Sequence, residues 1–265
     1  MTPWIGLVGT THPLGFAGLN LSLALAPALG VRAAAVCTGI TAQGLDDVLI
    51  RTTLDDATIA AQFRALDAVA PAAYHVGAQL DARVVRTVER ELSLRWAQAV
   101  VVDPVIATSG GARLADDATI AVLRSELFAC ALLVTPNLDE AERLLGATVR
   151  DEAAMREAGR ALLGFGPQAV LIKGGHLAAT ANEVVDVLVT ATETRTFRSS
   201  RAGSMRGTGD ALATAIAARL ALGEPLAAAV DHARRFVLAC IADAEVAGGM
   251  RVAPLQPERL PPSDP

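Results

Sequence analysis

The sequence predicts a single α/β domain with a mainly parallel central sheet. Short apolar runs rich in β-branched residues alternate along the chain with longer Ala- and Leu-rich segments whose apolar positions follow the helical period. This alternation is typical of βα units, in which helices cover a parallel sheet. No linker rich in proline or serine divides the 265 residues, so one domain over 1–250 is the simplest organisation.

In the first half of the chain, the runs WIGLV, RAAAVC and AVVVD predict strands, and the segments between them have helical period. We expect strands at 4–8, 32–37, 73–76 and 99–103, and helices at 14–29, 56–70, 80–94 and 116–128. Asp55 and Asp116 come directly before two of these helices, where the positive end of the helix dipole stabilises a carboxylate.

In the second half, the runs ALLVT, AVLI and VVDVLV predict further strands, and Asp151 marks another helix start. We expect strands at 131–135, 169–172, 184–189 and 194–198, and helices at 138–146, 151–164, 209–222 and 225–246. The last fifteen residues, 251–265, hold five of the 13 prolines and no periodic pattern, which predicts a mobile tail.

Composition excludes several classes of protein. The chain is 52% hydrophobic and 19% charged, which supports a packed core and argues against disorder. Its net charge of −5 disfavours a nucleic-acid-binding surface. Apolar stretches are interrupted before they reach about 18 residues, so no membrane span is expected. Three widely separated cysteines and a first basic residue at Arg32 favour a cytoplasmic protein with reduced thiols and no signal peptide.

The sharpest local motif is Arg206-Gly207-Thr208-Gly209-Asp210, which is followed at once by an Ala-rich helix. A glycine turn that enters a helix presents unpaired backbone N–H groups at the positive end of the dipole, which suits a phosphate or a developing anion. In the alternative interpretation, Asp210 is an ordinary helix cap and the glycines only permit a tight turn. The motif alone does not separate the two.

Three other strand ends carry polar residues. Asp103 ends AVVVD, Asn137 and Glu140 follow ALLVT, and Lys173 follows AVLI. In open α/β sheets, ligands bind at the carboxyl ends of the strands, and these groups suit Mg²⁺ and a polyphosphate. Each residue alone could be a turn or helix cap, but together they indicate a ligand site. No Walker-type P-loop occurs.

Lys173 is also notable for its rarity. The chain has 23 Lys and Arg residues, and all except Lys173 are arginines. Arginine therefore supplies the ordinary surface charge, whereas the one lysine stands in a strand-end KGG motif, where a compact ammonium can contact phosphates.

Several strings resemble one family. VVDPVIATSGGARL, LVTPNLDEAERLLG, VLIKGGH, DVL and RGTGDALATAIAARLALGEPLAAAV are similar to the hydroxymethylpyrimidine and phosphomethylpyrimidine kinases of thiamine synthesis, in the ribokinase-like superfamily. The similarity extends over about 4–247. It implies a three-layer α/β/α fold and a homodimer. It also implies transfer of the γ-phosphoryl group of ATP, with Mg²⁺, to a hydroxymethylpyrimidine or to its monophosphate.

The resemblance assigns roles residue by residue. Asp210 matches the catalytic carboxylate of the superfamily, and the backbone of Gly207, Thr208 and Gly209 matches its anion hole. As a hypothesis, Asp210 accepts the proton of the attacking hydroxyl. The remaining matches are ATP contacts at Lys173, Gly174 and Asn137, metal contacts at Asp103 and Glu140, and acceptor contacts at Gly9, Ser22, Gln43 and Val105. Arg206 precedes the anion hole, where it is either a further ATP contact that pairs with phosphate or a solvated loop arginine.

The acceptor side departs from the family pattern. Asp210 replaces the cysteine usual in the pyrimidine kinases, Ser22 stands where an aspartate would fall, and His75-Val76-Gly77-Ala78 replaces a Lys-x-Gly-Met segment. These changes leave two further readings open. One is a vitamin kinase that acts on pyridoxal or a related alcohol, and the other is a non-catalytic pyrimidine-binding relative.

The histidines and tryptophans carry open alternatives. His12, in the altered first loop, either reaches the pocket or is a solvated loop residue, and His176 is either a neighbour of the nucleotide or a plain turn residue. For His75, structural packing is at least as strong a reading as function. Trp4 and Trp96 are expected to pack in or beside core strands.

Overall fold

The computed structural model describes residues 1–44, 47–95, 99–108, 110–175 and 182–254. The strands are β1 (Trp4–Thr11), β2 (Arg32–Gln43), β3 (Val48–Thr53), β4 (Ala73–Val76), β5 (Ala99–Val102), β6 (Leu133–Val134), β7 (Ala169–Lys173), β8 (Glu183–Thr190), β9 (Thr194–Ser200), β10 (Glu245–Ala247) and β11 (Met250–Val252). The helices are α1 (Gly18–Leu25), η1 (Pro27–Leu29), α2 (Asp56–Leu66), α3 (Ala82–Ser93), α4 (Asp117–Ser125), η2 (Leu127–Cys130), α5 (Leu138–Leu145), α6 (Glu152–Leu163), α7 (Thr208–Ala221) and α8 (Leu226–Ala242).

The fold is built on one large twisted sheet. Over the described residues its nine strands run in the order β3-β2-β1-β4-β5-β6-β7-β8-β9. The pairs from β2 to β7 are parallel, and β3, β8 and β9 are antiparallel. The carboxyl ends of the parallel strands therefore meet at one edge, as the sequence predicts.

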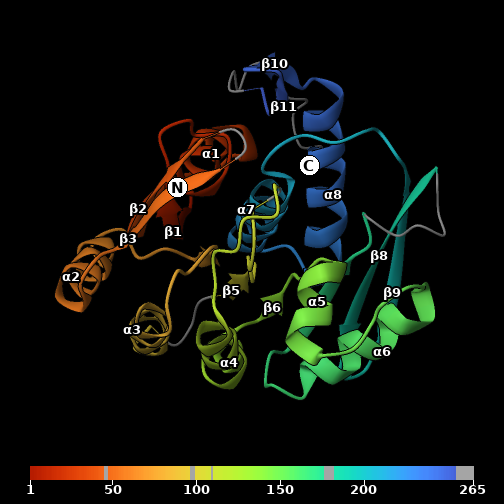
Figure 1. Ribbon diagram of the computed structural model, residues 1–265, viewed down its shortest axis with the longest axis horizontal. Helices are drawn as coiled ribbons and strands as arrows, with labels where there is room; N and C mark the ends of the chain where they lie inside the picture. Colours follow the sequence, from red (N-terminus) through yellow and green to blue (C-terminus); the bar gives the residue numbers. More distant parts are fainter. Residues whose placement is uncertain (45–46, 96–98, 109, 176–181, 255–265) are drawn as a thin grey trace.

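Helices cover both faces of the sheet, which confirms the three-layer α/β/α prediction. Helices α2 to α6 lie on one side in Figure 1, and α1, α7 and α8 lie on the other. Each side has its own apolar cluster. Alternating strand residues divide between them, so Val101 packs toward α7 while Val102 packs toward the opposite layer.

Aspartates cap the helices of the α2–α6 layer. The carboxylates of Asp55, Asp116 and Asp151 accept hydrogen bonds from backbone N–H groups in the first turns of α2, α4 and α6. Asp81 does the same for α3. These bonds satisfy donors that have no partner inside the helix, so the acidic residues noted in the sequence do mark helix starts.

The predicted helix over 14–29 is shorter than expected. Gly15 and Gly18 have positive φ, so the chain turns until Gly18, where α1 begins. Pro27 then opens the short 3₁₀ helix η1. The first loop therefore stays outside the helix, at the end of β1.

Two further differences from the sequence prediction concern hairpins. Strand β3 was not predicted, and the last helix was predicted to reach residue 246, whereas α8 ends at Ala242. Strands β10 and β11 follow, joined by Gly248 and Gly249, both at positive φ. The tail predicted at 251–265 therefore begins too early in the sequence, because residues 251 and 252 belong to β11. Its remainder from 255 lies outside the described residues.

Within the described part of the chain, none of the helices combines the length and apolarity needed to cross a membrane.

Candidate active site

The structure brings Asp103 and Lys173 together at the carboxyl edge of the sheet. The Lys173 Nζ lies 2.7 Å from Asp103 Oδ1, and Thr135 Oγ1 donates to the same oxygen at 3.0 Å. Asp103 is only 2% exposed. Burial alone would lower the pKa of Lys173, but the charges of Asp103 and Glu140 raise it above its ordinary value. Lys173 is therefore a fixed cation at this edge.

Asn137 and Glu140 form a capping box at the start of α5. The backbone N–H of Asn137 donates to Glu140 Oε2 at 2.8 Å, and the backbone N–H of Glu140 donates to Asn137 Oδ1 at 2.9 Å. Asn137 also pairs with Lys173 in a parallel bridge. Burial raises the pKa of Glu140 to about 7, with Lys173 opposing the shift and Asp103 adding to it. Asn137 and Glu140 are thus helix caps, as one interpretation of the sequence held. The Glu140 carboxylate nevertheless stays close enough to Lys173 and Asp103 to interact with their charges.

Two glycines at the start of α7, Gly207 and Gly209, allow the N-terminus of this helix to approach Asp103 and Lys173. Gly207 has a φ of +78°, and a Cβ there would stand 2.5 Å from the carbonyl oxygen of Phe16. A Cβ on Gly209 would stand 2.8 Å from Asp103 Oδ2 and 3.4 Å from Lys173 Nζ. A side chain at either position would push the helix away, so the first turn of α7 can lie this close to Asp103 and Lys173 because both residues are glycine.

Asp210 lies in the first turn of α7, partly exposed. Its Oδ2 accepts a hydrogen bond from the backbone N–H of Gly18 at 2.9 Å, while Oδ1 lies 3.6 Å from the position a Cβ on Gly77 would take. Burial raises the pKa of Asp210 to about 6, and the nearby charge of Asp103 adds to the shift. A carboxylate with this pKa is suited to accepting a proton near neutral pH.

The turn after β7 is held by a buried ion pair that was not predicted from the sequence. The backbone N–H of Gly174 donates to Asp186 Oδ1 at 2.9 Å, and Arg234 Nε donates to Asp186 Oδ2 at 2.7 Å. Asp186 and Arg234 are 6% and 7% exposed. A Cβ on Gly174 would lie 1.9 Å from the carbonyl oxygen of Val185, so the glycine is required. The only sequence signal was the DVL string, which includes Asp186.

Arg206 and Thr208 flank Gly207 at the entrance to α7. The backbone N–H of Arg206 donates to the carbonyl of Arg251 at 2.8 Å, and its side chain contacts Met250 Sδ at 3.4 Å. Arg206 thus ties the motif to the β10–β11 hairpin. Thr208 is the first residue of α7 and is partly exposed.

The predicted acceptor contacts are scattered by comparison. Gly9 lies beside Gly77, because a Cβ on Gly9 would stand 3.8 Å from the Gly77 carbonyl carbon. Val105 follows Asp103 and is partly exposed. Gln43 ends β2, beyond Ile40, the last β2 residue that pairs with β1. Gly9 therefore adjoins Gly77, the residue that borders Asp210.

Ser22, the fourth predicted acceptor contact, is buried between helices α1 and α7. It is 1% exposed, and its Oγ accepts a hydrogen bond from Thr214 at 2.9 Å, between α1 and α7.

The histidine predictions have different outcomes. His75 is 3% exposed and His12 is 7% exposed, so neither is a solvated residue. Burial lowers the pKa of both rings, and that of His75 falls to about 4. His176 and Trp96 lie outside the described residues.

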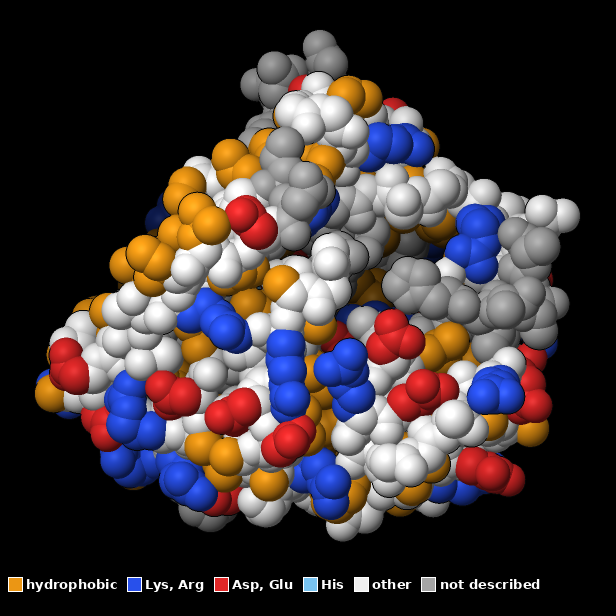
Figure 2. Space-filling model, in the orientation of Figure 1, with side chains coloured by type: hydrophobic (Ala, Val, Ile, Leu, Met, Phe, Trp, Pro, Cys, Tyr) orange, Lys and Arg blue, Asp and Glu red, His pale blue; other side chains and the backbone are white. Residues whose placement is uncertain are grey.

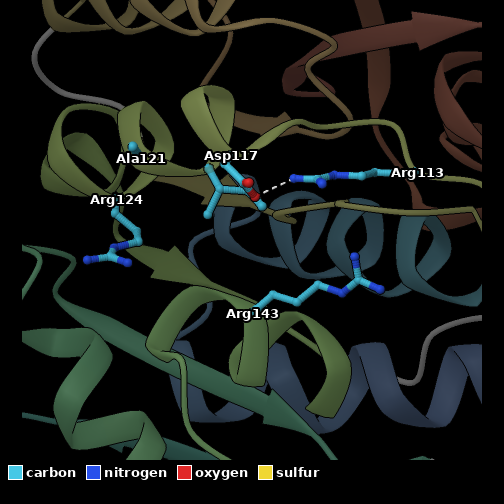
Figure 3. Close-up of a pocket in the computed structure, with 6 residues that line it drawn as sticks. Arg113, Asp117, Ala121, Arg124 and Arg143 are labelled. Carbon is cyan, nitrogen blue, oxygen red and sulfur yellow. Dashed lines mark hydrogen bonds and ion pairs between the residues drawn. The ribbon is translucent and has the colours of Figure 1, made fainter.

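A separate hollow of about 280 Å³ lies among α4, α5 and the loop before α4. Figure 3 shows Arg113 bonded to Asp117 at its rim, with the side chains of Arg124 and Arg143 on other sides. None of the residues predicted for the site lines this hollow.

The described residues contain no group of three or more His, Cys, Asp or Glu side chains arranged to hold a metal ion. Asp103 and Glu140 are thus a pair of carboxylates, which is a set that Mg²⁺ commonly uses when phosphates supply its other ligands.

The chain is similar to known proteins over most of its length. The sequence profile of the family described as Phosphomethylpyrimidine kinase matches residues 13–256. The hydroxymethylpyrimidine/phosphomethylpyrimidine kinase of Streptomyces coelicolor is 37% identical over 93% of this chain and 91% of its own length. The thiamine biosynthesis bifunctional protein ThiED of Geobacter sulfurreducens is 38% identical, and the chain spans only 48% of it.

Solved structures agree with the sequence comparisons. Phosphomethylpyrimidine kinase from Clostridium difficile 630 superposes with a TM-score of 0.79 at 27% identity, covering 89% of this chain and 98% of that one. Bacillus subtilis pyridoxal kinase, solved with ADP, has a TM-score of 0.89 over 98% of this chain and 100% of its own, but its 23% identity supports the ribokinase-like fold alone. From the profile and the curated relatives together, the chain belongs to the phosphomethylpyrimidine kinase family and is a phosphotransferase.

Proposed function

We propose that the protein transfers the γ-phosphoryl group of ATP to 4-amino-5-hydroxymethyl-2-methylpyrimidine, to its monophosphate, or to both. The observation that carries this proposal is the approach of the α7 N-terminus and Asp210 to the Asp103–Lys173 pair, which Gly209 permits. The choice of a pyrimidine alcohol is supported by relatives named hydroxymethylpyrimidine/phosphomethylpyrimidine kinase that are 36–37% identical to the chain.

In this proposal the first turn of α7 binds the transferred phosphoryl group. The backbone N–H groups of Gly207, Thr208 and Gly209 and the ammonium of Lys173 stabilise the charge on its oxygens, and Asn137 and Arg206 act as further ATP contacts. Asp210 is held through Oδ2 by Gly18, so Oδ1 is the oxygen that accepts the proton of the attacking hydroxyl.

The charge of the cluster supports a requirement for Mg²⁺. Asp103, Glu140 and Asp210 face a single ammonium, that of Lys173, so the ionised cluster is negative and would repel the phosphates of ATP. A divalent cation held by Asp103 and Glu140 would offset this charge and that of the β- and γ-phosphates. Burial raises the pKa of Glu140 to about 7 and the charge of Asp103 adds to the shift, whereas a bound cation would keep that carboxylate ionised.

The direct test is the Asp210→Asn variant, which keeps the side-chain shape and an oxygen for the Gly18 N–H. We expect kcat for the pyrimidine alcohol with Mg-ATP to fall by about 10²- to 10⁴-fold, because a general base is lost. The matched control is Asp116→Asn, another change at a helix start, where asparagine caps as well as aspartate. Undiminished turnover by Asp210→Asn would contradict the role.

The same assay decides the acceptor. Pyridoxal is the competing alcohol, favoured by Asp210 and by Ala78 in place of a methionine. Phosphorylation of pyridoxal without phosphorylation of the pyrimidine would overturn the proposed substrate while leaving the phosphoryl-transfer chemistry intact.

We also propose that the protein is a homodimer that uses β3. This strand is an edge of the sheet, and Leu49 and Ile50 are 73% and 61% exposed on it, with Ile40 of β2 47% exposed. Figure 2 shows apolar side chains gathered over β2 and β3. Exposed edges with apolar side chains are suited to pairing with another chain. Sedimentation velocity should show a dimer that Ile50→Lys converts to monomer, whereas a wild-type monomer would contradict the proposal.

A cytoplasmic location is proposed on the chemistry of the thiols. Cys37, Cys130 and Cys240 are all unpaired, which suits a reducing compartment.

A further inference from the structure

The ring of His75 has an unusual environment for a core residue. His75 is on β4, is 3% exposed, and its Nε2 has no hydrogen-bond partner among the described residues. A buried polar atom without a partner costs about 1–3 kcal/mol, and native structures hold few of them. Packing alone therefore does not account for a histidine here.

The other side of the ring joins a chain of hydrogen bonds that can select its tautomer. Thr214 Oγ1 lies 2.9 Å from Ser22 Oγ and 3.1 Å from His75 Nδ1. When Thr214 donates its single hydrogen to Ser22, it accepts from His75, and Nδ1 then carries the ring hydrogen, which is the tautomer taken in the proposal below. Because burial lowers the pKa of His75 to about 4, the ring is neutral at pH 7 and Nε2 presents a lone pair.

This lone pair faces the same small space as Asp210. A Cβ on Gly77 would stand 3.6 Å from His75 Nε2 and 3.6 Å from Asp210 Oδ1, so the two atoms border the volume that this glycine leaves open. Asp210 Oδ2 is already bonded to Gly18, and no described residue donates to Oδ1. A water molecule in such a space can connect polar groups that are too far apart for a direct bond.

We propose that His75 is a positioning residue for Asp210, an inference that rests on the proposed function of that carboxylate. When the acceptor hydroxyl attacks the γ-phosphorus of ATP, the new O–P bond forms while the bond from phosphorus to the β,γ-bridging oxygen breaks, and ADP leaves with that oxygen. The O–H bond of the acceptor breaks, and its proton moves to Asp210 Oδ1. His75 Nε2 accepts the resulting hydrogen bond through a water above Gly77. The proton stays on Asp210 and no further reactant is needed. Ser22 is then the last member of the hydrogen-bond series Ser22–Thr214–His75, which orients the His75 ring.

Two variants test this without replacing the ring. In Gly77→Ala, the new Cβ makes ordinary contacts of 3.6–3.9 Å with Asp210 and His75, so the fold accepts it, but it fills the place of the water. In Thr214→Val, Nδ1–H loses its acceptor and the tautomer is no longer fixed. We expect kcat to fall about tenfold in each, with KM for ATP and for the alcohol within twofold of wild type. Thr87→Val, which alters a buried helical threonine bonded to Arg83, is the matched control.

Replacement of the ring supplies the rescue test. His75→Leu should lose kcat like Gly77→Ala, whereas His75→Gln, whose amide can donate to Thr214 and accept toward Gly77, should recover most of it. Wild-type kcat in both Gly77→Ala and His75→Leu would overturn the inference. A raised KM for the alcohol with unchanged kcat would also overturn it, because His75 would then contact the acceptor itself.

The tautomer gives a readout that does not depend on turnover. ¹⁵N NMR of the His75 ring at pH 7 should show a protonated Nδ1 and a bare Nε2 in the wild-type protein, and a change in Thr214→Val. A protonated Nε2 in the wild type would overturn the inference even if no substrate were known. If Asp210→Asn lost activity but Gly77→Ala did not, the inference would fail while the proposed function stood.

Discussion

The proposed phosphoryl-transfer side and the proposed acceptor side of the site differ in how their polar groups are satisfied. Asp103 and Lys173 are bonded to side chains, and Asn137 Oδ1 accepts from the backbone N–H of Glu140. Among the described residues, the buried side-chain atoms that lack a partner belong to residues in or shortly after β1, β2 and β4, namely His12, Thr38, His75 and Gln79. In the proposed site, the first group is bonded without ligand, and the second leaves polar groups for an acceptor or water to satisfy.

The largest expected effect is on the proposed phosphoryl-transfer side. Lys173→Ala removes the cation that faces Asp103 and the α7 N-terminus, so we expect kcat/KM for ATP to fall about 10³-fold, which is about 4 kcal/mol. Lys173→Arg should not restore it, because the ammonium is only 15% exposed and lies against Gly209, where a guanidinium does not fit.

Steady-state kinetics with varied Mg-ATP measure this effect. Arg64→Ala, an exposed arginine on α2, is the control and should change nothing. If Lys173→Arg behaved like wild type, the cluster would be less closely fitted than its distances indicate.

The second effect concerns the ion pair under the Gly174 turn. Asp186→Ala leaves Arg234 buried without its anion, so we expect unfolding free energy to fall by about 3–5 kcal/mol. The Gly174 N–H also loses its acceptor, so KM for ATP should rise. Urea unfolding measures the first quantity.

Asp231→Ala removes the partner of Arg235 in an exposed pair on α8, and should cost less than about 1 kcal/mol. Equal losses in the two variants would mean that Asp186 and Arg234 are as well solvated as a surface pair.

These two regions also show what the sequence could and could not predict. The strand-end residues Asp103 and Lys173 were predictable, because parallel strands deliver their carboxyl ends to one edge whatever the details of packing. The Asp186–Arg234 pair was not, because its members are 48 positions apart and no local pattern specifies which charges meet. Ser22 was assigned to the acceptor site from its position in the sequence alone. The orientation of α1 that buries Ser22 depends on packing against α7, which the sequence does not show.

The same limit explains the missed hairpins. Strand β3 shows no alternation of buried and exposed residues, since it lies at the sheet edge and most of it is exposed. Without a buried face, a strand leaves no period-two pattern in the sequence. The β10–β11 turn did carry a Gly-Gly signal, but the strands are too short to show a pattern around it.

The third prediction concerns stability and pH at Asp210. Its pKa is raised from 3.8 to about 6, so folding favours the protonated carboxyl, and stability is lost as pH rises through about 6. Asp210→Asn should therefore be more stable than wild type at pH 7.5, by about 2 kcal/mol. The difference should vanish below about pH 3, where both the folded and the unfolded wild-type carboxyl are protonated.

Thermal unfolding across this pH range measures the difference. If Asp210→Asn is inactive and also more stable than wild type, the ionised Asp210 carboxylate lowers stability and serves catalysis. A loss of stability at pH 7.5 would mean that the Gly18 hydrogen bond to the ionised carboxylate outweighs its burial.

The smallest effect tests the acceptor side. Thr38 is 1% exposed, and its Oγ1 has no partner among the described residues. Thr38→Val removes this unsatisfied hydroxyl with little change of shape, so the unfolding free energy without ligand should rise by about 1 kcal/mol. If the acceptor bonds this hydroxyl, KM for the pyrimidine alcohol should rise about fivefold while KM for ATP stays constant. If Thr38→Val is more stable but KM for the alcohol is unchanged, the Thr38 hydroxyl is an unsatisfied group of β2 that does not contact the acceptor. The contrast between the two sides of the site would then depend on His12, His75 and Gln79 alone.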